Sequence, residues 1–146
     1  MVAGLNVLGA VVAVLFFLSA IGVFTCRLTN LRRAERWLGY FEYLLAVPLV
    51  YLLIQAPAVP RPWLYYVQIG FALLWLAGEW VLDDLLKIGF RHTRRLVISY
   101  VVLFFAAAGG LMGIASLAGR GWTIAAGSLF LVMAVLTFVQ RKVTGE

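Results

Sequence analysis

The chain has 146 residues, of which 64% are hydrophobic and 12% are charged, and its mean hydropathy is +1.02. Soluble domains are roughly half apolar and about a quarter charged, so this composition excludes a water-soluble globular protein. The net charge of +6 would favour a nucleic-acid partner in a soluble protein. In this chain the bias of basic residues toward alternate loops accounts for the excess, so no nucleic-acid partner is expected.

Five apolar segments approach the length of about 20 residues that a helix needs to cross a bilayer. They are residues 2–26, 37–55, 63–82, 96–117 and 122–140. The connections are short, and the second contains Pro57, Pro60 and Pro62. The sequence therefore predicts an all-α fold, a single transmembrane domain over residues 1–146 that forms a bundle of five helices without room for a soluble catalytic domain.

Basic residues are concentrated in alternate loops. Residues 27–36, residues 83–95 and the C-terminal tail contain four, four and two Lys or Arg, whereas the opposite side has only Arg61 and Arg120. Because basic loops are retained in the cytoplasm, this bias predicts the N-terminus outside and the C-terminus in the cytoplasm. We expect a multi-pass protein of the cytoplasmic (inner) membrane of a prokaryote, whose basic loops lie against anionic membrane lipids.

The fourth segment has a stripe of small residues, Ala106, Gly109, Gly113 and Ser116. Small residues let two membrane helices approach closely, and Gly109 and Gly113 have the G-x-x-x-G spacing of such contacts. The stripe predicts a close helix contact, made either with another helix of the same chain or with a second copy in a homo-oligomer through Gly109 and Gly113.

Pro48 lies in the middle of the second segment. Proline cannot donate a backbone hydrogen bond to the carbonyl four residues earlier, which belongs to Leu44, so a kink is expected there. The kink serves either helix packing or the opening of a cavity.

Two acidic residues, Glu42 and Glu79, lie inside the predicted spans. An ionisable side chain costs about 2.5 to 3.5 kcal/mol at the centre of the membrane and less near its ends, so each needs a partner, water or a ligand. Both glutamates fall near the predicted cytoplasmic ends of neighbouring helices, where they could meet. Two carboxylates that face each other away from water favour binding a proton, so the pair is a candidate site of proton exchange.

A polar and aromatic face follows the third segment, because residues three or four apart lie on the same side of a helix. This face bears Gln68, Ala72, Trp75, Glu79 and Asp83. Nearby rings could stabilise a positive charge. The candidate binding residues for a cation or a lipid-like molecule are therefore Glu42, Glu79, Trp75, Gln68, Asp83, Tyr43 and Trp80. The alternative is that arginines of the basic loops neutralise the two glutamates in ties between helices.

Several kinds of site are excluded by the sequence. Cys26 and His92 are the single cysteine and the single histidine, so an intrachain disulfide, a thiolate-bound zinc or iron–sulfur centre and a bis-histidine haem cannot be built. The nucleotide-binding and hydrolase motifs are also absent. We therefore expect no metal and no cofactor, and we interpret His92 as a surface residue of a basic loop.

Three functions remain open. The first is a small transporter or channel-like protein for a cation, with proton coupling, or for an amphipathic solute, in which case a polar cavity should cross the bundle. The second is a membrane-embedded enzyme that uses carboxylate acid–base chemistry on a lipid or isoprenoid-like substrate, in which case a blind pocket should open to lipid or cytosol. The third is a non-catalytic subunit of a membrane complex, in which case the bundle should be solid.

Overall fold

The computed structural model describes residues 1–87 and 93–145. The elements in chain order are α1 (Val2–Leu28), α2 (Arg32–Leu44), α3 (Ala46–Gln55), the short 3-10 helix η1 (Ala56–Ala58), α4 (Trp63–Glu79), the π-helical segment η2 (Trp80–Leu85), α5 (Arg94–Ser116) and α6 (Arg120–Thr144).

Five helical stretches of the described residues are long and apolar enough to cross a membrane: Val2–Leu28, Arg32–Ala58, Trp63–Leu85, Arg94–Ser116 and Arg120–Thr144. The predicted all-helical fold with five spans is thus confirmed by length and composition. The second stretch begins five residues before the predicted position 37, because the helix continues through the basic residues that precede its apolar part.

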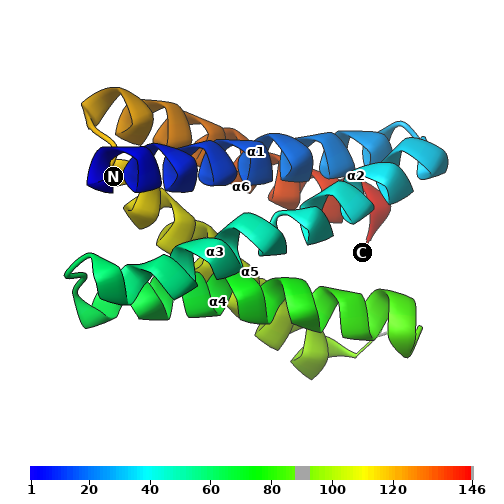
Figure 1. The fold of residues 1–146 in the computed structure, drawn as a ribbon. Helices are drawn as coiled ribbons and strands as arrows, with labels where there is room; N and C mark the ends of the chain where they lie inside the picture. The colour runs from blue at the N-terminus through cyan, green and yellow to red at the C-terminus, as the bar shows by residue number, and fades with distance from the viewer. Residues whose placement is uncertain (88–92, 146) are drawn as a thin grey trace.

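The helix α1 is the most buried of the five candidate spans. It packs against α2, α3, α5 and α6, and it is buried on several sides, as a helix with apolar residues all around it should be. Figure 1 shows α1 beside α6 at one edge and α3 beside α4 at the other, with α5 crossing between the two pairs. The connection between α1 and α2 lies at one end of the bundle, whereas the α3–α4 and α5–α6 connections lie at the other end, which holds the N-terminus (Figure 1). We call this the far end, and we call the opposite end, which carries the basic loops, the basic end.

The interior is filled from the middle of the bundle toward the far end. The large side chains that are almost completely buried there include Phe16, Phe17, Leu49, Leu52, Ile69, Leu111 and Ile114. A polar tie closes the same end: Arg61 Nη2 donates to Asn6 Oδ1 at 2.6 Å, and Asn6 Nδ2 donates to the carbonyl of Leu117 at 3.1 Å. The far end is therefore closely packed and joined by hydrogen bonds between helices and loops.

The second span is interrupted at Leu45, between α2 and α3. This residue lies three positions before Pro48, whose ring disturbs the carbonyl four residues upstream, that of Leu44. Beyond the interruption the two helices take different partners: α3 packs against both α1 and α4, whereas α2 packs mainly against α1. The bend thus takes α2 away from α4 toward the basic end (Figure 1).

The close contact predicted for the small residues of α5 is made partly by different glycines. Gly110 faces the backbone of Gln68 in α4, since a Cβ added there would lie 3.1 Å from the carbonyl oxygen of Gln68. Gly113 lies against the side-chain amide of Gln68, whereas a Cβ on Gly109 would have nothing within 4 Å. Gln68 is thus a packing partner of α5. A homo-oligomer through Gly109 and Gly113 stays a prediction.

Candidate functional site

A cavity of about 500 Å³ opens at the basic end, where α2 and α4 separate. We call it the outer chamber. All five acidic residues that the structure describes line it, together with three arginines; these are Glu35, Glu42, Glu79, Asp83 and Asp84, and Arg27, Arg32 and Arg36. A chain with a net charge of +6 thus has a cavity in which acids outnumber bases.

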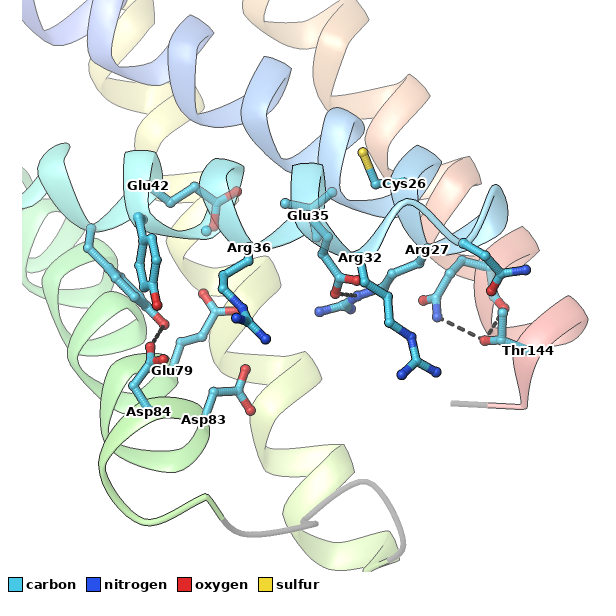
Figure 2. A pocket seen from close by; sticks show the side chains of 16 residues that line it. Cys26, Arg27, Arg32, Glu35, Arg36, Glu42, Glu79, Asp83, Asp84 and Thr144 are labelled. Carbon is cyan, nitrogen blue, oxygen red and sulfur yellow. Dashed lines mark hydrogen bonds and ion pairs between the residues drawn. The ribbon is translucent and has the colours of Figure 1, made fainter.

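Two walls carry these charges. Figure 2 shows that Arg32, Glu35, Arg36 and Glu42 come from α2, while Glu79, Asp83 and Asp84 come from the opposite wall formed by the end of α4 and by η2. Wider helical turns of the π type occur often at functional sites, and here such a turn carries both aspartates.

Glu42 is the most deeply buried of these acids, with 3% of its surface exposed. Ser19 of α1, Glu79 and Arg27 are its electrostatic neighbours. A carboxylate buried in this way, without an ion-pair partner within 4 Å among the described residues, is costly in a membrane interior, because charge there needs compensation.

Glu79 approaches the same space from α4. Tyr100 of α5 donates a hydrogen bond from its hydroxyl to Glu79 Oε1 at 3.1 Å. Glu42 and Glu79 both line the outer chamber and a smaller cavity behind it, so side chains from α2 and α4 do converge as the sequence predicts. Their role in binding stays a prediction.

The smaller cavity, which we call the inner chamber, has a volume of about 80 Å³. Aromatic rings form much of its wall: Phe24, Trp75, Tyr100 and Phe104. The ring centroids of Trp75 lie 5.2 Å from those of Phe104 and 6.1 Å from those of Tyr100, so the rings form a continuous cluster. The indole nitrogen Nε1 of Trp75 is buried and has no acceptor among the described residues.

One charge pair in the outer chamber is satisfied internally. Arg27 Nε donates to Glu35 Oε1 at 2.6 Å, and both side chains are partly shielded from solvent. With this pair set aside, four acids face Arg32 and Arg36, which form no ion pair within the described ranges 1–87 and 93–145. Acids thus outnumber bases among the described residues that line the outer chamber.

The predicted site residues fall into three groups. Glu42, Glu79, Asp83 and Tyr43 line the outer chamber, and Trp75 lines the inner one. Neither chamber includes Gln68, which packs against α5, or Trp80, whose side chain is 48% exposed. Trp80 follows Glu79 directly, so its side chain points about 100° around the helix from that of Glu79. The helical spacing alone therefore did not decide whether Trp80 faces the cavity.

Several lining residues were not identified from the sequence. Asp84 follows Asp83 directly, so its position beside an acidic residue was the available signal. Three further lining residues come from α5 and α6, namely Tyr100, Phe104 and Gln140. They could be assigned to the site only once the packing of these two helices was known. His92 and Arg91 of the basic loop lie outside the described residues. In the described part of the chain, no three His, Cys, Asp or Glu side chains are grouped to hold a metal ion.

Comparison with protein-family models, with curated proteins and with solved structures found no match to this chain.

Proposed function

We propose that the protein is a small transporter for a cationic, amphipathic solute, which enters the outer chamber from the basic end and binds between Glu42 and Glu79. The observation that carries this proposal is the gathering of all five described acidic residues on one cavity of a chain that is otherwise strongly basic. Intramembrane acids next to aromatic rings suit the binding of a cation.

The shape of the cavity supports an amphipathic solute over a simple ion. The outer chamber is lined mainly by charged and polar side chains, whereas the inner chamber adds aromatic rings such as Phe24 and Phe104 to a smaller set of charged groups, Arg27, Glu42, Glu79 and Arg141. Binding sites for organic ligands combine apolar walls with a few placed polar groups. A hydrated metal ion would gain nothing from the aromatic part.

Proton coupling follows from the chemistry of the same pair. A carboxylate binds either a proton or an organic cation, so the two compete for Glu42 and Glu79. Acidification of the basic side should therefore release the solute, and a proton gradient could drive its movement.

A second function is favoured by one observation. The interior beyond the inner chamber is filled by large apolar side chains such as Phe16 and Phe17, so the cavity is blind toward the far end. A blind pocket suits an enzyme that draws a lipid-like substrate from the basic side and uses Glu42 and Glu79 as acid and base. Transport instead requires a second arrangement of the helices that opens the far end.

Exchange of protons for cations in proteoliposomes tests the proposal. Vesicles with an acidic interior and an enclosed pH-sensitive dye are given hexyltrimethylammonium outside. We expect the interior to become alkaline faster than in protein-free vesicles, and we expect Glu42→Gln and Glu79→Gln to abolish this difference. Lys142→Gln removes a charge from an exposed position at the same end and serves as the matched control.

The outcome of this experiment separates the alternatives. Equal exchange by the wild-type protein and both glutamine variants contradicts the proposal. If there is no exchange, and mass spectrometry detects a modified lipid that the two variants do not form, the enzyme takes its place. Absence of both activities leaves the non-catalytic subunit.

A further inference from the structure

We propose that the inner chamber selects the charged group of the solute: an alkyl-substituted ammonium with a hydrogen-bond acceptor, such as a hydroxyl or ether oxygen, close to the nitrogen. This inference rests on the proposed function and specifies its substrate class.

The walls favour a substituted ammonium over a primary amine or a guanidinium. Phe24, Trp75, Tyr100 and Phe104 present aromatic surface, and rings of this kind attract a desolvated cation without accepting directional hydrogen bonds. A primary ammonium has three N–H donors and a guanidinium has five, and most of them would lose their partners on leaving water. A fully alkylated nitrogen has no such donors to satisfy.

The acids supply the compensating charge at the same place. Glu42 and Glu79 line the inner chamber as well as the outer one, so they lie where the two cavities join. Arg27 and Arg141 also line the inner chamber, and the charge of Arg27 is compensated by its ion pair with Glu35. A cation seated among the rings therefore remains close to both carboxylates. The inner chamber holds about 80 Å³, which limits it to the head of the solute and leaves any longer part in the outer chamber.

Trp75 adds the second requirement. Its side chain is 3% exposed, and its Nε1–H is a donor with no acceptor in the part of the chain that the structure describes. A buried donor that lacks an acceptor costs about 1 to 3 kcal/mol, so a partner supplied by the ligand would restore the loss. Because Trp75 lines the chamber where the ammonium binds, the acceptor should lie on the ligand near the nitrogen.

Two small soluble probes, tetramethylammonium and choline, separate the contributions. They share the trimethylammonium group, and choline has in addition a hydroxyl two carbons away. We expect the wild-type protein in lipid nanodiscs to bind choline about fivefold more tightly than tetramethylammonium, which is the fold-change of one neutral hydrogen bond. Guanidinium should bind at least tenfold more weakly than either. Isothermal titration calorimetry measures all three.

Variants assign the preference to individual groups. Trp75→Phe keeps an aromatic ring and removes the N–H, so the affinity for choline should fall to that for tetramethylammonium, which should change little. Phe104→Leu removes one ring without touching the indole, so both probes should weaken together while the preference for choline stays. Glu42→Gln should weaken both by tenfold or more.

The result that overturns this inference differs from the one that overturns the proposed function. Equal binding of the two probes by the wild-type protein, or an equal loss of both in Trp75→Phe, contradicts the substrate class even when hexyltrimethylammonium is exchanged for protons. The substrate class is also contradicted if guanidinium binds as tightly as tetramethylammonium does. If Trp75→Phe does not fold, the probe comparison in the wild-type protein and in Phe104→Leu decides. The proposed function fails when proton exchange is absent or is independent of Glu42 and Glu79.

Discussion

The hydroxyl of Tyr43 donates a hydrogen bond to Asp84 Oδ2 at 2.7 Å, and this bond joins α2 to η2 across the outer chamber. The bend at Leu45 has already taken α2 away from α4 at this level, so the two walls are held together here by side chains rather than by helix packing. The bond thus ties the two walls of the outer chamber to each other (Figure 2).

Breaking the tie should loosen the outer chamber. We expect Tyr43→Phe to lower stability by about 1 to 2 kcal/mol, because a hydrogen bond to a charged acceptor is lost, and to speed the dissociation of bound tetramethylammonium. Thermal unfolding in detergent and stopped-flow measurement of the off-rate test this.

Tyr40→Phe provides the control for that change. Tyr40 also lines the outer chamber and is exposed, and no hydrogen bond of its hydroxyl is found among the described residues. An equal effect of the two substitutions would show that the Tyr43–Asp84 bond has no special part in closing the cavity.

The ion pair of Arg27 and Glu35 should affect the affinity for cations. Substitution of Arg27 should raise this affinity, and substitution of Glu35 should lower it. Arg27 is an electrostatic neighbour of Glu42, so Arg27→Gln removes a repulsive charge and should tighten tetramethylammonium binding. Glu35→Gln leaves Arg27 without its counter-charge and should weaken it. Each substitution should change the dissociation constant of tetramethylammonium on the order of fivefold at low salt and by less at high salt. Titrations of both variants that move in the same direction would contradict this electrostatic account.

The number and the length of the spans could be predicted because they depend on hydropathy along the chain, which needs no knowledge of neighbours. The convergence of Glu42 and Glu79 could be predicted for a similar reason. Their depth follows from their distance to the ends of the apolar segments, and the membrane aligns those ends. What could not be predicted is which helix would face which.

Gln68, Gly109 and Trp80 illustrate this limit. The face of α4 on which Gln68 lies is shared between two environments: its end near Glu79 meets the cavity, while Gln68 itself meets Gly110 of α5. Helical spacing identifies residues that share a face of the helix. It does not show which part of that face packs against the neighbouring helix and which part meets the cavity. The choice between Gly109 and the adjacent Gly110 depends on a rotation of one residue, about 100° around α5, which only packing decides.

The contact between α4 and α5 should therefore be sensitive to one glycine and insensitive to the next. Gly110→Ala places a methyl group against the backbone of Gln68, which cannot move aside as a side-chain end could. We expect a loss of about 1 to 3 kcal/mol from overpacking. Gly109→Ala meets open space and should be neutral or stabilising by up to about 1 kcal/mol, because alanine favours helix. Thermal unfolding of the two variants in the same detergent makes the comparison, and equal destabilisation would argue against the observed packing.

The orientation predicted from the basic loops decides which compartment supplies the solute. Ten Lys or Arg at the basic end against two at the far end should place the cavity mouth in the cytoplasm. In a Cys26→Ser background, Gly121→Cys and Val143→Cys introduce single thiols at the far and basic ends without altering any charge, and both sites are exposed. A membrane-impermeant maleimide should label Gly121→Cys in intact cells, whereas Val143→Cys should be labelled only after the membrane is permeabilised. The reverse pattern would place the chamber mouth outside. The solute would then be taken from the exterior, and a gradient acidic outside would release it there, not drive its export.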